Sequence, residues 1–140
     1  MSGEKVEIKW VNDIYFNDKK ICGILAEGHF NFASQKIDAV VIGIGVNICT
    51  DDFPIELKKK AGSLFIEGEK IFDKLKFAEE ICNQLYDILR NNNVKIIDEY
   101  KSRSNLIDCK VEVSPVINQN EKNYLAKVID ITDEAKLKVK

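Results

Sequence analysis

The feature that most constrains the fold is a near-continuous apolar run from Ile37 to Ile48, punctuated by Gly43 and Gly45. Its longest uninterrupted part, AVVIGIGV, falls far short of the roughly 20 residues that a membrane-spanning helix needs. Runs of this kind are typical of a strand that is covered on both faces. We therefore predict a strand here that is buried on both faces, preceded by a polar loop over residues 28–36.

A strand and a hairpin are predicted upstream of this run. Residues 5–10 alternate between apolar and charged side chains, which indicates a half-buried strand with Trp10 in the core. Two further strands, over residues 14–16 and 20–27, are expected on either side of a tight turn at Asn17-Asp18.

Lys20 is expected at the first position of the second hairpin strand, beside the turn. Because successive side chains of a strand point to opposite faces, alternation places Lys20 on the same face as Cys22 and Ile24. The opposite face would carry Ile21, Gly23 and Leu25.

Helices are predicted in the second half of the chain. A long amphipathic helix is expected to begin after the N-cap Asp73 and to end at Asn91-Asn92-Asn93. One apolar stripe of this helix can pack on the sheet, and it comprises Leu75, Ala78, Ile81, Cys82, Leu85, Ile88 and Leu89. Short helical stretches are also expected after Pro54 and over residues 94–102.

From Cys109 the apolar period changes to two, which predicts about three strands with turns near Asn118–Glu121 and Asp133-Glu134. The predicted fold class is α+β (α/β), a mixed β-sheet packed by helices and followed by a partial, small β-barrel-like domain. We place the division between residues 1–105 and residues 106–140, the second part being an incomplete all-β domain.

Composition excludes several classes of function. With 21 basic and 23 acidic residues, the net charge of −2 provides no global field for nucleic acid or an anionic membrane. The four cysteines are dispersed and there is one histidine, so no metal site is expected and the thiols should be reduced. The first residues contain no apolar signal-peptide core, which predicts a cytoplasmic location.

Three motifs could carry chemistry, and each has a structural alternative. Gly43 and Gly45 form G-x-G, but Ile48 stands where a dinucleotide-binding motif has its third glycine, and no helix opens there. These glycines could admit a ligand close to the backbone, with Asn47 beside it, or could serve packing alone. Asn12-Asp13 could be a turn pair or could supply a carboxylate to a site.

Lys20 could likewise be a solvated hairpin lysine or a cation that faces a phosphate.

Two ordered segments resemble a known family. KWVNDIYFNDKKICGILAE is similar to the Lys-Trp-Pro-Asn-Asp segment of biotin–protein ligases, which is followed after a hairpin by a lysine and Gly-Ile-Leu. VVIGIGVNI looks like the second hallmark strand of that family, in which Gly-x-Gly-x-Asn closes over the ligand. The resemblance extends over essentially the whole chain and identifies residues 1–105 with the C-terminal half of the ligase catalytic domain.

This resemblance implies an enzyme that makes biotinyl-5'-adenylate from biotin and ATP and then transfers biotin to a lysine of a carboxylase carrier domain. Lys20 would contact the biotin carboxylate and the phosphate, and Asp13 would orient or deprotonate the acceptor lysine, with Asn12 in the same site. The other residues implied to bind biotinyl-adenylate are Gly23, Gly43, Gly45 and Asn47. Mg²⁺ is implied as the counterion of ATP, without a set of protein ligands.

The sequence departs from the family pattern in two ways. Val11 stands where proline is commonest, and we expect valine to keep the backbone extended there. The family's glycine- and arginine-rich biotin-binding loop has no counterpart here, so the chain looks like a ligase fragment that is inactive, or nearly so, alone. The helical DNA-binding extension of repressor members is also missing.

Three hypotheses follow from these observations. The chain is part of a biotin–protein ligase, or it is a non-catalytic remnant that binds a carrier domain or a second copy of itself through the sheet edge. A small nucleic-acid-binding β fold is the third, and the balanced charge and few clustered aromatics of residues 109–140 argue against it.

Overall fold

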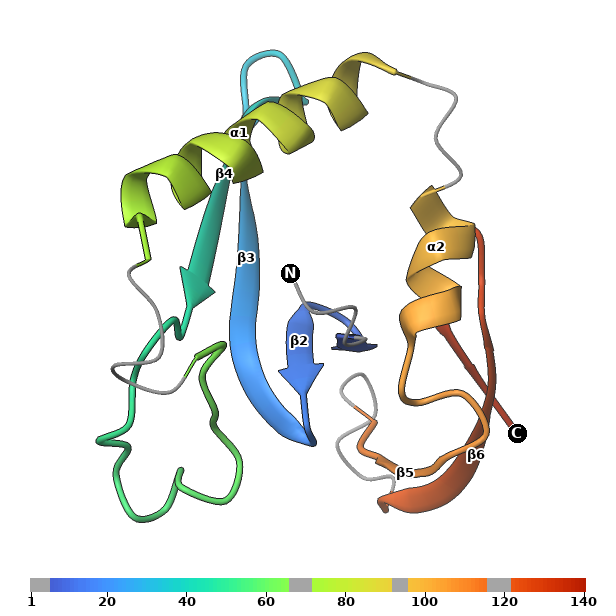
Figure 1. Ribbon diagram of the computed structural model, residues 1–140. Helices are drawn as coiled ribbons and strands as arrows, with labels where there is room; N and C mark the ends of the chain where they lie inside the picture. The colour runs from blue at the N-terminus through green and yellow to red at the C-terminus, as the bar shows by residue number, and fades with distance from the viewer. Residues whose placement is uncertain (1–5, 66–71, 92–95, 116–121) are drawn as a thin grey trace.

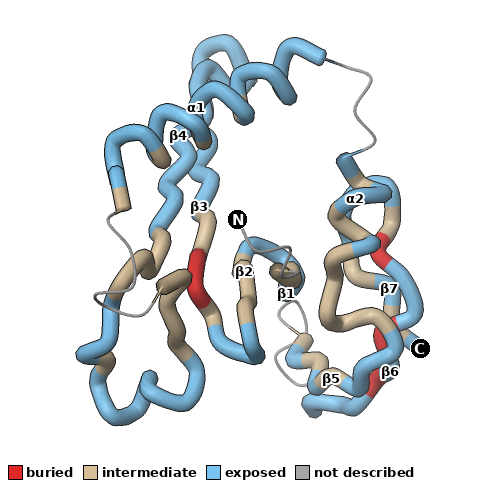
Figure 2. Tube along the Cα trace, viewed as in Figure 1, coloured by how far each residue is buried: buried red, intermediate tan, exposed pale blue. Residues whose placement is uncertain are grey.

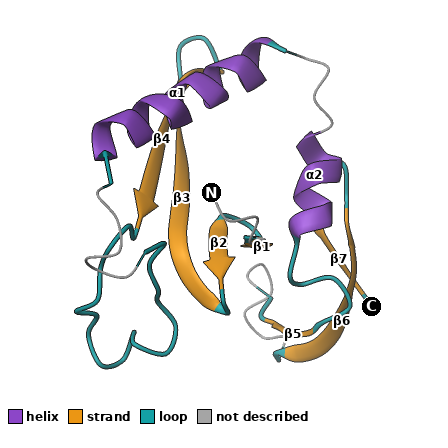
Figure 3. Ribbon diagram, viewed as in Figure 1, coloured by secondary structure: helices purple, strands orange, loops and turns teal. Residues whose placement is uncertain are grey.

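The computed structural model describes residues 6–65, 72–91, 96–115 and 122–140 (Figure 1). Two antiparallel sheets and two helices make up this part of the chain (Figure 3), which confirms the predicted α+β class. The elements are β1 (Glu7–Lys9), β2 (Asp13–Phe16), β3 (Lys19–Asn31), β4 (Lys36–Val46), α1 (Lys74–Arg90), α2 (Ile96–Arg103), β5 (Lys110–Val113), β6 (Tyr124–Ile131) and β7 (Leu137–Val139).

The first sheet has the order β1-β2-β3-β4, with each strand antiparallel to the next. The predicted tight turn between β2 and β3 is confirmed, because Asn17 and Asp18 adopt positive φ angles of 48° and 59°, which asparagine and aspartate tolerate well. The polar loop predicted over residues 28–36 is wrong. Strand β3 continues to Asn31, which pairs with Lys36, so only four residues form the connection.

The prediction that residues 37–48 form a strand buried on both faces is right about the strand and wrong about its burial. Val41 is 64% exposed and Ile37 is 61% exposed, and no residue of β4 is buried in the described part of the chain. The physical reason is that burial of both faces needs a layer of structure on each side, and α1 crosses only part of the hairpin of β3 and β4 (Figure 1).

Helix α1 begins as predicted, because the Asp73 carboxylate accepts hydrogen bonds from the backbone N–H groups of Leu75 and Lys76. Asn91 is its C-cap. Its predicted apolar stripe is only partly packed, because Leu75 and Leu89 are strongly exposed. The stretch after Pro54 forms hydrogen-bonded turns rather than a helix.

The second sheet has the order β5-β6-β7 and confirms the predicted change of period. It is an open sheet of three strands and not a closed barrel. Its core is formed by Ala126, Val128 and Ile131 of β6, which are buried (Figure 2). The predicted turn at Asp133-Glu134 is present, whereas the turn predicted near 118–121 lies outside the described residues.

None of the helices described here has the length and apolar character that a transmembrane span requires.

We predict that Ile131→Ala lowers the free energy of unfolding by about 2–5 kcal/mol, because Ile131 is fully buried and the substitution leaves a cavity. Ile129→Ala is the matched control, since Ile129 lies in the same strand but is 41% exposed, and it should cost clearly less. Urea unfolding monitored by circular dichroism measures both. Equal losses for the two variants would contradict this assignment of the core.

Candidate functional site

Asn12 connects the turn that follows β1 to strand β3. Its backbone carbonyl accepts a hydrogen bond of 2.9 Å from the N–H of Ile24, and its side-chain amide donates to the carbonyl of Ile24. Asp13, the next residue, begins β2. The Asn-Asp pair therefore ends a turn and also places a carboxylate at the start of β2. The two alternatives for this dipeptide, a turn pair and a source of a carboxylate, both apply.

A β-bulge decides where Lys20 lies. Ile14 pairs with Cys22, but Tyr15 pairs with Lys20, so β3 has one extra residue in this part of the ladder. A bulge of this kind shifts the alternation of side chains along the strand. The side chain of Lys20 consequently lies on the face of Gly23, and the prediction that it shares a face with Cys22 and Ile24 is wrong. Lys20 is also the second residue of β3, not its first.

On this face Lys20 is paired with Asp13. The distance from Lys20 Nζ to Asp13 Oδ1 is 2.6 Å, with the two side chains 43% and 27% exposed. A Cβ atom on Gly23 would lie 3.2 Å from both Nζ and Cε of Lys20. The absence of a side chain at Gly23 therefore leaves the room that the ammonium group occupies.

Three glycines keep the same face of the sheet open. Gly23 is opposite Asp13 on one side and Gly45 on the other, and Gly43 is opposite Leu25. A Cβ on Gly45 would meet only the carbonyl of Gly23, at 3.9 Å, and a Cβ on Gly43 only that of Leu25, also at 3.9 Å. Within the described part of the chain, packing does not require glycine at positions 43 and 45. The ligand-binding alternative for these residues gains support.

Lys20 lies between two cavities. One has a volume of about 500 Å³ and is lined by Asn12, Asp13, Gly23, Gly43, Gly45 and neighbouring residues. The other has a volume of about 610 Å³ and is lined by Cys22, Asn47, Leu57, Lys60, Ala61 and neighbouring residues. Lys20, Gly23 and Gly45 line both cavities. The arrangement suits a ligand with two parts and an anionic group between them.

The wall of the larger cavity is fixed by the backbone of Lys20. The N–H of Lys20 donates to the carbonyl of Lys60, at 2.8 Å, and the carbonyl of Lys20 accepts from the N–H of Gly62, at 2.9 Å. The side-chain amide of Asn47 donates to the carbonyl of Gly62, at 3.0 Å. Sequence reasoning missed Lys60 and Ala61 as lining residues, because no local motif marks a loop that pairs with a strand far earlier in the sequence.

Burial raises the pKa of the Cys22 thiol, and the nearby Asp13 carboxylate adds to this shift while Lys20 opposes it. The thiol therefore keeps its proton at neutral pH and does not provide a nucleophile. Among the residues that the structure describes, no group of three or more histidine, cysteine, aspartate or glutamate side chains could hold a metal ion.

Trp10 and Val11 contact two other elements. The indole N–H of Trp10 donates to the carbonyl of Ala135, at 2.8 Å, and the hydroxyl of Tyr100 donates to the carbonyl of Val11, also at 2.8 Å. The prediction that Trp10 is in the core is wrong, since it is 36% exposed and lies in a turn. Val11 lies in the same turn.

Comparisons with known proteins agree with the motifs at this site. Residues 1–47 match the model of the Biotin/lipoate A/B protein ligase family. The bifunctional ligase/repressor BirA of Bacillus spizizenii is 47% identical over 73 residues, which are 50% of this chain and 22% of that protein. The biotin–[acetyl-CoA-carboxylase] ligase of Mycobacterium tuberculosis is 31% identical over 109 residues, 76% of this chain and 38% of that protein. The chain is a relative of the biotin–protein ligases.

Solved structures of biotin protein ligase from Aquifex aeolicus share the fold. The apo structure has a TM-score of 0.68 at 24% identity, and it is matched over 94% of this chain and 56% of its own. The complex with biotin and ATP has a TM-score of 0.71 at 21% identity, over 94% and 53% of the two chains. This biotin–protein ligase relative thus spans about half the length of those solved chains and less than half of the two curated ligases.

We predict that Gly23→Ala displaces the ammonium group of Lys20 from Asp13 without unfolding this ligase relative, because the new methyl group meets the flexible end of a side chain. Acylation of Lys20 by an N-hydroxysuccinimide ester, followed by mass spectrometry, should become faster. Gly45→Ala is the control, because its methyl group would have no atom of Lys20 within 4 Å. An unchanged rate for Gly23→Ala would contradict the placement of Lys20.

Proposed function

We propose that this chain provides the lysine- and aspartate-bearing part of a biotin–protein ligase site. The enzyme forms biotinyl-5'-adenylate when the biotin carboxylate attacks the α-phosphate of ATP and pyrophosphate leaves. A carrier lysine then attacks the biotinyl carbonyl and releases AMP. The observation that carries this proposal is the position of Lys20 at the junction of two cavities on a glycine-lined sheet face.

In this proposal the Lys20 ammonium group faces the atoms at which negative charge develops. Its partner Asp13 holds it at the junction, and an incoming carboxylate or phosphate provides a second anion for the same cation. The compact charge of lysine suits an acceptor that changes from carboxylate to mixed anhydride during the reaction. Lys20 thus stabilises both steps without becoming covalently modified.

Gly23, Gly43 and Gly45 would let the adenylate approach the backbone, and Asn47 would bind near the ribose or phosphate. The open space at Gly43 and Gly45 supports this assignment. The amide N–H₂ group of Asn47 already donates to the carbonyl of Gly62, so its proposed role includes holding the loop that forms the cavity wall.

Asp13 is proposed to orient or deprotonate the acceptor lysine, because only the neutral amine is a nucleophile. Its Oδ1 atom is paired with Lys20, and Asn12 lines the same cavity. A carboxylate that lines this cavity and is 27% exposed can receive a proton from an amine that approaches from outside. Mg²⁺ would enter with ATP as its counterion.

The proposed partner is the biotin carboxyl carrier domain of a carboxylase, and the proposed location is the cytoplasm. We retain the division into residues 1–105, the C-terminal half of a catalytic domain, and residues 106–140, an incomplete all-β domain.

We predict that a non-hydrolysable biotinyl-adenylate analogue binds this chain, and that Lys20→Ala weakens binding by about 10–100-fold, as expected for the loss of one charge-assisted hydrogen bond. Lys19→Ala is the matched control, since the neighbouring lysine lines neither cavity. Isothermal titration calorimetry measures the affinities. Equal effects of the two substitutions would refute the assignment of Lys20.

The exposed apolar surface of β4 supports the further proposal that more polypeptide of a ligase domain completes this half of the site. The side chains of Val40, Val41 and Ile42 are between 42% and 64% exposed. A groove of about 380 Å³ separates Ile42, Ile44, Val46 and Ile48 from Phe77, Ala78 and Ile81 of α1. Apolar surface of this extent on a single chain is typical of a surface that another polypeptide covers.

The same surface favours the second candidate function, a non-catalytic module that binds a carrier domain or a second copy of itself. Strand β4 is an edge of the four-stranded sheet and has 11 residues, so its backbone offers a long ladder for a further strand. A homodimer through this edge is the specific form of this alternative.

We predict that the chain alone biotinylates a carrier domain at a rate several orders of magnitude below that of a complete ligase, because the groups that clamp the ligand from the other side are not supplied. Transfer of radiolabelled biotin to a purified carrier domain measures this rate. A rate close to that of a complete ligase would contradict the half-site proposal. Binding of the analogue without transfer would agree with it.

A further inference from the structure

The turn that leads into Asp13 is held by contacts to three elements, namely β3, α2 and the turn between β6 and β7. Trp10 donates to the carbonyl of Ala135, Val11 accepts from the hydroxyl of Tyr100, Asn12 is bonded to Ile24, and Asp13 is paired with Lys20. The last two contacts lie within the first sheet. The first two come from the turn between β6 and β7 and from α2, which are far away in the sequence.

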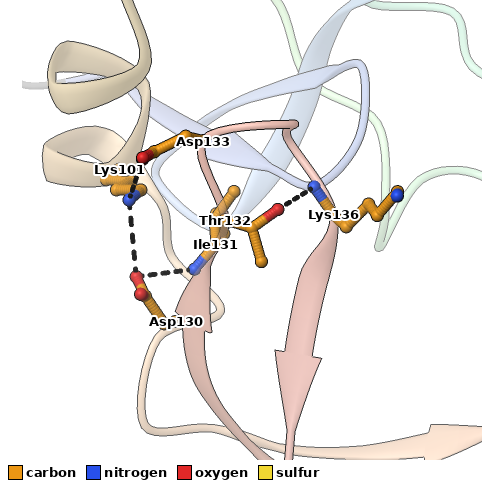
Figure 4. Close-up of polar contacts among 6 residues, drawn as sticks. All are labelled: Lys101, Asp130, Ile131, Thr132, Asp133 and Lys136. Atoms are coloured by element: carbon orange, nitrogen blue, oxygen red, sulfur yellow. Dashed lines mark hydrogen bonds and ion pairs between the residues drawn. The ribbon is translucent and has the colours of Figure 1, made fainter.

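The two distant contacts are themselves joined. Lys101, next to Tyr100 in α2, places its Nζ 3.2 Å from Asp133 Oδ1 and 3.9 Å from Asp130 Oδ1 (Figure 4). Asp133 lies in the same turn as Ala135, the acceptor of the Trp10 indole. Helix α2 and the β6–β7 turn therefore form one support for residues 10 and 11.

We propose that Tyr100 and Trp10 are positioning residues, through which α2 and the second sheet fix Asp13 against Lys20. This inference rests on the proposed function for the role of Asp13, but the positioning itself concerns the chain alone. Neither residue lines the two cavities, so both act through the backbone of the turn.

The chemistry of the two donors suits this role. Tyr100 is half-buried, and burial raises the pKa of its hydroxyl above the ordinary value, so the hydroxyl keeps its proton and donates throughout the neutral range. The acceptors are backbone carbonyls, whose positions are set by the local fold. The bond donated by the Trp10 side chain and the bond accepted by the Val11 carbonyl together limit the directions in which the turn can move.

Tyr100→Phe removes one hydroxyl and keeps the ring, and Tyr86→Phe in α1 is the matched control because Tyr86 is 57% exposed and lies away from the turn. Hydrogen exchange followed by NMR gives the readout. The N–H of Ile24, which donates to Asn12, reports the turn, and the N–H of Asn47, which donates to Ile21, reports the other side of β3.

We expect Tyr100→Phe to accelerate exchange at Ile24 by about 3–10-fold, which corresponds to the loss of one hydrogen bond, with little change at Asn47. Tyr86→Phe should change neither amide. The single tryptophan gives an independent signal, since a loosened turn should shift the fluorescence of Trp10 to longer wavelength. Trp10→Phe should produce the same selective exchange. Equal acceleration at both amides, or none at Ile24, would overturn the proposal.

Titration with the biotinyl-adenylate analogue separates this inference from the proposed function. If the unmodified chain binds the analogue, Tyr100→Phe should weaken binding by about 3–10-fold, whereas Tyr86→Phe should not. Binding that is unaffected by Tyr100→Phe would overturn the positioning role. If the unmodified chain does not bind the analogue while exchange at Ile24 is selectively accelerated, the positioning is supported and the proposed function is not.

Discussion

The β-bulge between β2 and β3 is the feature on which the rest of the site depends. A regular ladder would direct the Lys20 side chain to the face of Cys22, whose side chain is buried. With the extra residue, the ammonium group lies beside Asp13 and above Gly23 instead. The backbone of Lys20 is then free to pair with residues 60–62, which form a wall of the larger cavity. One inserted residue therefore sets both the ion pair and the cavity that it adjoins.

Local signals explain which parts of this structure could be predicted from the sequence. The Asp73 N-cap, the Asn17-Asp18 turn and the period of two in β6 each depend on residues close together in the chain, and each was predicted correctly. The candidate site residues come from the resemblance of two motifs to those of biotin–protein ligases, and their roles stay predictions. The bulge and the contact of Trp10 with Ala135 could not be predicted, because both depend on pairing between segments.

The strand β4 shows how a correct secondary structure can accompany a wrong prediction of burial. Apolar residues at successive positions are typical of a strand that is buried on both faces, as in sheets with a layer of helices on each side. In the described chain these faces remain exposed, and the chain matches only about half of the solved ligases. The pattern in the sequence therefore predicts covered faces, while the apolar side chains of β4 are exposed in the part of the chain that the structure describes.

The energy needed to order the turn explains why contacts from a second sheet matter for the site. Fixing the backbone of four residues costs about 4–8 kcal/mol in conformational entropy. Each hydrogen bond contributes about 0.5–1.5 kcal/mol, so the two bonds of Asn12 and the pair between Asp13 and Lys20 together provide less than this cost. The bonds of Trp10 and Val11 bring the sum close to balance. On this balance the contacts from α2 and the β6–β7 turn are a substantial part of what holds the turn before Asp13, which agrees with the proposed positioning role of Trp10 and Tyr100.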